Sequence, residues 1–178
     1  AALLAFTPPT TTAVLVDTTA PTVSSVQIVL AYRPTNYSIA VTGLFGTNSF
    51  IVAKVTMSEP VAIVTNTTPS GEPPLRLALS LDGTNVPAGF TTTTLPDTTP
   101  RELYFLHIIQ AGQTDTNGIS IAANSHSLNG ATLLDAAGNA ATLTHLAVAD
   151  NLEYRVDTTA PTVTISATST NSTRSSPV

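Results

Sequence analysis

The 178-residue chain contains no cysteine and no tryptophan, and only 10% of its residues are charged. Without cysteine there is no disulfide framework, no thiolate metal site and no cysteine nucleophile. Lysine occurs once, at Lys54, and the formal net charge is −5. So few cationic side chains argue against binding to nucleic acid or to an anionic membrane surface.

Signals of a leader or of a membrane span are also missing. The sequence does not begin with methionine and has no positively charged segment followed by an apolar core. No run approaches the roughly 18 apolar residues of a transmembrane helix. We therefore expect a processed or excised segment that does not enter a membrane. The Thr- and Ser-rich composition, poor in lysine and free of cysteine, favours an extracellular or cell-surface location.

The composition predicts an all-β protein. Helix-favouring Glu, Lys, Arg and Gln are scarce, β-branched Thr is abundant, and 13 prolines and nine glycines are spread along the chain. Apolar residues alternate most clearly at 74–82 and 50–57. Strands are predicted at 23–30, 50–57, 60–65, 74–82, 102–110, 119–123, 131–134, 140–146 and 152–156. Many short strands separated by turn residues indicate an antiparallel two-sheet sandwich.

The octapeptide VDTTAPTV occurs twice, at Val16–Val23 and again 140 residues later at Val156–Val163. Such a long period is typical of an array of repeats. It predicts one unit at 24–163, preceded by residues 1–23 as the end of a previous unit or a donor strand. Residues 164–178 are then a linker or the start of the next unit. We expect Asp17, Pro21, Asp157 and Pro161 to stiffen the junctions, because Asp bonds nearby backbone and Pro fixes φ.

Five segments, in this order and ending with the second octapeptide, carry a family resemblance. The chain resembles the bacterial Ig-like tandem repeats of large secreted and cell-surface proteins in Ser58–Val61 (SEPV), Leu75–Asp82, Leu103–Gly112, Leu128–Leu143 (LNGATLLDAAGNAATL) and Val156–Val163. The resemblance implies an Ig-like β-sandwich that serves as a building unit of an extracellular protein. It implies no catalytic activity.

Catalytic residues are not predicted. The three histidines are His107, His126 and His145, and none is spaced from another as metal ligands or a catalytic pair would be. No Gly-x-Ser-x-Gly segment is present to support a Ser/His/Asp triad. We expect His107 to lie on the inward face of its strand as a core residue.

Calcium is the one cofactor that the sequence leaves open. Asp115 and Asn117 offer two side-chain oxygens in a short loop, without the downstream glutamate of a full calcium loop. The resemblance implies calcium near Asp135 and Asp157, at the ends of the sandwich. The alternative is that Asp135 begins a turn and Asp157 caps the next strand. Glycosylation sequons stand at Asn36, Asn66 and Asn171.

Two apolar surfaces are candidates for assembly. The first is an N-terminal apolar run that contains Ala1, Leu3, Leu4 and Phe6. The second is the outward face of the 102–110 strand, which carries Tyr104, Leu106 and Ile108. The run could pair with the open edge of a neighbouring copy, as in donor-strand complementation, or within its own chain. The outward face marks either a covered central strand or a contact surface.

Together these features predict a non-enzymatic structural subunit or repeat of an extracellular fibre, filament or giant adhesin. Its partners would be copies of itself or adjacent repeats, joined by strand pairing and Pro-stiffened junctions. The alternative is an Ig-like adhesion module that binds a sugar or protein ligand through loops 65–73 and 91–100.

Overall fold

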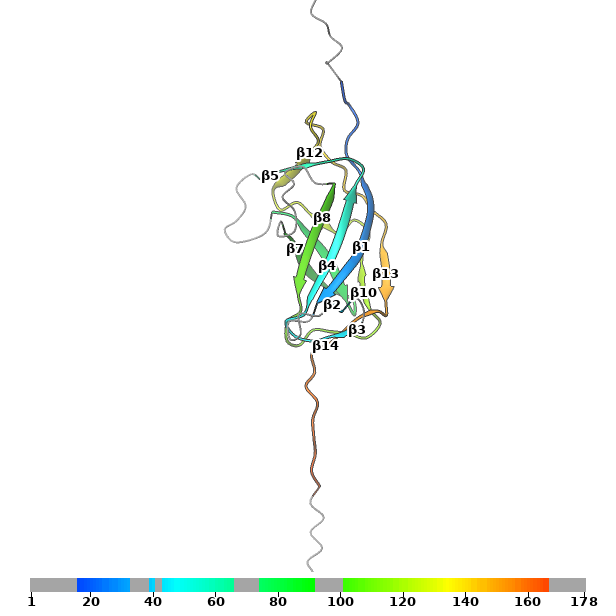
Figure 1. Cartoon of the computed structure of the whole chain (residues 1–178), viewed down its shortest axis with the longest axis vertical. Helices are drawn as coiled ribbons and strands as arrows, with labels where there is room; N and C mark the ends of the chain where they lie inside the picture. Colours follow the sequence, from blue (N-terminus) through cyan, green and yellow to red (C-terminus); the bar gives the residue numbers. More distant parts are fainter. Residues whose placement is uncertain (1–15, 33–38, 41–42, 66–73, 92–100, 167–178) are drawn as a thin grey trace, which may run out of the picture.

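The computed structural model describes residues 16–32, 39–40, 43–65, 74–91 and 101–166 (Figure 1). These residues contain no helix and form fourteen strands, which confirms the predicted all-β class. The strands are β1 (Val23–Tyr32), β2 (Ile39–Ala40), β3 (Gly43–Phe45), β4 (Phe50–Met57), β5 (Ala62–Thr65), β6 (Arg76–Leu81), β7 (Thr84–Thr91), β8 (Glu102–Ile108), β9 (Thr114–Asp115), β10 (Ile119–Ile121), β11 (His126–Ser127), β12 (Ala131–Leu134), β13 (Val148–Asn151) and β14 (Tyr154–Asp157).

A nine-stranded antiparallel sheet dominates the fold, in the order β13-β10-β6-β7-β8-β4-β1-β2, with β11 pairing β6. It folds over on itself in a sandwich-like arrangement, with β1, β4 and β8 running side by side along the molecule (Figure 1). Small sheets close the two ends: β5 pairs β12 at one, and β3-β14-β9 lie at the other. Strand β14 is antiparallel to β9 but parallel to β3.

The core is built by the alternating residues that the sequence marks. Strands β4, β6 and β8 each bury every second side chain, because successive side chains of a strand point to opposite faces. The fully buried group includes Ile51, Leu77, Leu79, Leu103 and Phe105. This continuous apolar cluster holds both ends of the sandwich in place.

The sequence prediction missed strand β7, which pairs with β6 along its length. The connection is a two-residue turn at Asp82 and Gly83, with φ of 44° and 82°. Positive φ at both positions matches the type I′ hairpin turn, whose twist suits the flanking strands. Asp82 and Gly83 therefore form a tight hairpin turn, and β7 continues the hairpin beyond it.

The strand predicted at 140–146 is wrong. Among the described residues this segment makes two isolated bridges, Leu134 to Ala140 and Thr22 to Thr142. Beyond them the chain is held by side chains, since Asn124 Oδ1 accepts from the amide of His145 at 2.9 Å. Regular pairing resumes at β13, which pairs with β10.

Candidate functional site: the two copies of the octapeptide

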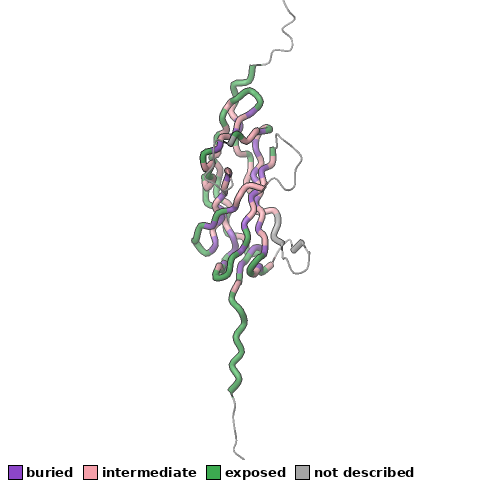
Figure 2. Tube along the Cα trace, turned by 90° about the vertical axis from the view of Figure 1, so that its left-hand side faces the viewer, coloured by how far each residue is buried: buried purple, intermediate pink, exposed green. Residues whose placement is uncertain are grey.

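The two copies of the octapeptide lie at opposite ends of the long axis (Figure 1). We call Val16–Val23 the leading copy and Val156–Val163 the trailing copy. The chain runs into the sandwich through the leading copy and away from it through the trailing copy. Beyond β14, Thr158 is half-buried and residues 159–166 are exposed, the green tail in Figure 2.

The second half of the leading copy is gripped by the sandwich. The amide of Thr142 donates to the Pro21 carbonyl at 2.8 Å, and Thr22 exchanges hydrogen bonds of 2.9 and 2.8 Å with Ser58. Pro21 is buried and Val23 packs on the core as the first residue of β1. The backbone then pairs with β4.

Hydrogen bonds also reach back into the first half of the leading copy. The side-chain amide of Asn139 donates to the carbonyl oxygens of Asp17 and Thr19, at 3.1 and 3.4 Å. Asp17 Oδ1 accepts from the Thr19 amide at 2.9 Å, an Asx turn of the kind that short Asp side chains favour. Asn139 was not among the predicted site residues, and nothing local in the sequence connects it to residue 17.

In the trailing copy it is the first half, not the second, that contacts the sandwich. Val156 is buried within β14, opposite Phe45 of β3 and Asp115 of β9. Thr158 Oγ1 accepts from the amide of Gly112 and donates to the carbonyl of Gln113, both at 2.9 Å. Its Asp157 forms the same Asx turn as Asp17, with the Thr159 amide at 2.8 Å.

Burial in the two identical sequences is therefore complementary. Val16 is 85% exposed, whereas its counterpart Val156 is 1% exposed. At the other end the order reverses, because Val23 packs on the core and Val163 is 86% exposed. An exposed valine is unremarkable alone. The same eight residues, however, bury opposite halves at the two ends of one sandwich.

Carboxylate oxygens of Asp17, Glu59 and Asp135 all lie within 4.8 Å of one another beside the leading copy. Burial opposes ionisation of Asp135, but hydrogen bonds from the side chain and backbone of Asn139 and from nearby amides outweigh it and lower the pKa of Asp135. Oxygen ligands of this kind suit calcium. The sequence pointed to Asp135, and the SEPV segment that contains Glu59 was the available signal for the second carboxylate.

The other predicted calcium residues lie apart from this group in the described part of the chain. Asp115 is buried and accepts hydrogen bonds from the amides of Asp82 and Gly118, while burial raises the pKa of Asp115. The side chain of Asn117 donates to Asp150 Oδ2 at 2.9 Å. Asp115 and Asn117 thus clasp neighbouring loops, and Asp157 forms the Asx turn described above.

The histidines occupy structural positions. His107 is buried as predicted, with Nδ1 2.9 Å from the Pro87 carbonyl and Nε2 3.0 Å from Gln113 Oε1. The rings of His126 and His145 meet edge to face at 4.7 Å, a contact that their sequence separation did not suggest. Burial, and then the proximity of His145, lowers the pKa of His126 to about 4.

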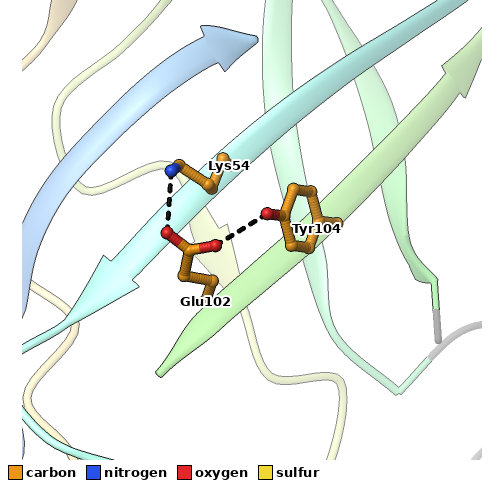
Figure 3. Close-up of polar contacts among 3 residues, drawn as sticks. All are labelled: Lys54, Glu102 and Tyr104. Atoms are coloured by element: carbon orange, nitrogen blue, oxygen red, sulfur yellow. Dashed lines mark hydrogen bonds and ion pairs between the residues drawn. The ribbon is translucent and has the colours of Figure 1, made fainter. Parts of the chain in front are cut away.

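The predicted outward face of β8 is partly covered. Tyr104 donates to Glu102 Oε2 at 2.7 Å, and Glu102 Oε1 pairs with Lys54 Nζ at 2.8 Å across to β4 (Figure 3). Hydrogen bonds from Lys54 and then Tyr104 lower the pKa of Glu102. Leu106 is half-buried and Ile108 is 40% exposed.

Several predicted sites lie outside the described residues. They are the apolar residues Ala1, Leu3, Leu4 and Phe6, the sequons at Asn36, Asn66 and Asn171, and nearly all of loops 65–73 and 91–100. The donor-strand, glycosylation and ligand-loop hypotheses therefore stay predictions.

Comparison with protein-family models, curated proteins and solved structures gave no match for this chain. Within the described ranges no helix has the length and apolarity needed to cross a membrane. The fold and the two copies of the octapeptide are therefore the features of the chain that bear on its function.

Proposed function

We propose that this protein is a non-enzymatic structural unit of an extracellular fibre, filament or adhesin. Units are joined end to end, and each copy of the octapeptide is shared between two neighbouring sandwiches. The preceding unit holds the first half of the copy as the last strand of its fold. The following unit holds the second half as its first strand.

Complementary burial carries this proposal. Val16 is exposed here, whereas the same residue in the trailing copy is packed between β3 and β9. Val163 and Ile165 are each 86% exposed, and they alternate as apolar residues of a strand do. Burying such a side chain fully stabilises a protein by about 1.5–3 kcal/mol. Neighbouring units would cover all three residues.

The directions of the two chain ends support a linear array. Both ends leave along the long axis at opposite poles (Figure 1). A head-to-tail contact that does not close into a ring generates an extended assembly. An array of such units therefore lengthens along one axis, as a fibre or a surface stalk requires.

Structural use of the polar residues supports a non-enzymatic role. His126, the most catalytic-looking side chain, has a pKa that burial lowers to about 4, and it packs against the ring of His145, whose Nε2 accepts from the Ser125 amide at 3.1 Å. His145 Nδ1 lies 2.8 Å from the carbonyl of Leu146, so that ring is held by the backbone at both nitrogens. These side chains fix the segment that leads to β13.

A two-unit protein tests sharing of the octapeptide. Residues 1–163 are followed directly by residues 24–178, so that a single VDTTAPTV stands between the units. Unfolding enthalpy scales with the number of folded residues, at about 0.7 kcal/mol per residue near 60 °C. We expect about twice the calorimetric enthalpy of the natural chain.

The matched control has two octapeptides at the joint, made by following residues 1–166 with residues 16–178. Each unit then has its own copy, and the enthalpy should not rise further. An enthalpy equal to that of one unit in the shared protein, with a doubled value in the control, would rule out sharing.

Electron microscopy of the purified natural chain separates two forms of the proposal. Regular polymers indicate a subunit that assembles by itself. A monodisperse monomer eliminates the self-assembling filament and leaves a repeat within a longer surface protein.

A further inference from the structure

We infer that neighbouring units meet in a rigid joint that contains no free linker residue, with the C-terminal pole of one unit docked on the N-terminal pole of a second copy. The C-terminal pole is the end of the sandwich that holds the trailing copy, at β3, β9, β14 and the loop of Gly112 and Gln113. The N-terminal pole is the end that holds the leading copy, at Ser58, Asn139 and Thr142. The inference rests on the proposed function, because it assumes that one octapeptide serves both units. It goes further, since a shared segment could equally act as a flexible tether between separate beads.

The two grips on the octapeptide interlock. The C-terminal pole holds Val156, Asp157 and Thr158, through β14 and through the hydroxyl of Thr158. The N-terminal pole holds the leading copy at residues 17, 19, 21 and 22, through Asn139, Thr142 and Ser58. The positions of the trailing copy that correspond to these four, 140 residues later, are 157, 159, 161 and 162. Residue 157 is then held from both sides, and no free residue separates 158 from 159.

Both grips act on one backbone shape. Asp17 and Asp157 make the same Asx turn, at 2.9 and 2.8 Å. Their bonds do not compete, because the C-terminal pole uses the Thr158 hydroxyl and the N-terminal pole uses the carbonyl oxygens of residues 17 and 19. A carbonyl oxygen has two lone pairs, so residue 157 can serve its strand and Asn139 together.

The burial of the two copies is compatible as well. The C-terminal pole buries the first position of the octapeptide and half-buries the third. The N-terminal pole buries the sixth and half-buries the fifth and eighth. No position is buried in both copies, so the two units would cover different residues of the segment.

Because the two sets of contacts are on adjacent residues of the shared octapeptide, the two poles must lie close together. Consecutive Cα atoms are about 3.8 Å apart. The loop that holds Thr158, at Gly112 and Gln113, must therefore lie against the Asn139 turn of the next unit. Pro161 fixes its own φ and restricts the residue before it, which further limits the freedom of the segment.

The C-terminal pole of a second copy is thus the partner of the N-terminal pole, and it delivers Asp157 to the place that Asp17 has here. The contacts named are hydrogen bonds within the chain, and none requires a metal ion. Stiffness should therefore persist in a chelator, which separates this joint from one stiffened by calcium.

Pulsed electron spin resonance on the two-unit protein tests the joint. The chain has no cysteine, so Ala122→Cys, at an exposed position, gives one spin label per unit. The protein is measured in EDTA, alone and with Gly-Gly-Ser-Gly-Gly-Ser inserted after Thr159. Six such residues have a root-mean-square length of about 13 Å. We expect a narrow distance distribution that broadens by about that amount with the insertion.

Two further variants examine the grip itself. Thr158→Val in the first unit removes both hydroxyl bonds and should broaden the distribution. Thr159→Ala is the matched control, because its side chain is exposed and only its backbone is held; it should leave the distribution narrow. An unmodified protein as broad as the insertion variant overturns the rigid joint. If calorimetry shows that both units are folded, that outcome leaves the shared octapeptide standing.

Discussion

Val156→Ala and Val16→Ala make the same chemical change in the same eight-residue sequence, and they should differ sharply in effect. Because the local sequences are identical, changes in the unfolded chain are nearly equal and cancel in the comparison. The difference between the two variants therefore reports folded-state burial alone. Val156 is 1% exposed and Val16 is 85% exposed.

The expected cost at Val156 follows from the two methyl groups removed. Burial contributes about 0.8 kcal/mol for each such group, or about 1.6 kcal/mol for the pair. Incomplete collapse of the space beneath β14 adds a cavity contribution. We expect Val156→Ala to lower the free energy of unfolding by about 2 kcal/mol. Val16→Ala should change it by less than about 0.5 kcal/mol, as at other exposed positions.

Urea unfolding followed by circular dichroism measures both variants in the natural chain. With a slope of about 2 kcal/mol per molar urea, Val156→Ala should move the midpoint down by about 1 M, at unchanged slope. Equal midpoint shifts for the two variants would refute the difference in burial between the copies. So would a Val156→Ala variant as stable as the natural chain.

Three other results are expected. Because the pKa of His126 is about 4 in the fold and 6.5 in the unfolded chain, the unfolded chain binds more protons between these values; stability should fall by up to about 3 kcal/mol as the pH drops from 7 to 4, and His126→Phe should flatten that slope in urea titrations. Gly118→Ala should cost at least about 2 kcal/mol, because its Cβ would lie 2.1 Å from a backbone oxygen. Gly138→Ala, also at positive φ but in open space, should cost only about 1–2 kcal/mol, and equal losses would contradict the clash. Calcium should raise the melting temperature, with EDTA reversing the rise and Asp17→Asn abolishing it; a melting curve unchanged by calcium would refute binding at the acidic group.

Strands with strict alternation were predictable from sequence, since one wet and one apolar face fix their register. This holds for β4, β6 and β8. Strand β7 was missed because Pro87 and Gly89 interrupt its pattern, and pairing with β6 outweighs that weak propensity. The 140–146 segment alternates convincingly, yet its neighbours pair elsewhere and leave it only two bridges.

The junctions were predictable only in part. Repetition of eight residues predicts a unit boundary without any knowledge of the fold. Which half of each copy is buried depends on β3, β4 and β9, strands that are distant in sequence. Likewise Asp135 could be singled out from its turn, but its proximity to Asp17 and Glu59 arises only when folding brings three segments distant in sequence together.

The most direct measurement concerns Val163 in two contexts. Val163→Ala should not alter the free energy of unfolding of the natural chain, where this residue is 86% exposed. In the two-unit protein with a single octapeptide at the joint, the same change should destabilise the second unit by about 1 kcal/mol, because the valine takes the place of Val23 on its core. Val156→Ala should destabilise the first unit of that protein. The variant Phe50→Trp, made in one unit at a time, gives tryptophan fluorescence that follows the unfolding of that unit alone, since the chain has no other tryptophan. If the octapeptide is shared, Val156→Ala lowers the free energy of unfolding of the first unit and Val163→Ala lowers that of the second. A Val163→Ala variant without effect in the two-unit protein would contradict sharing of the octapeptide.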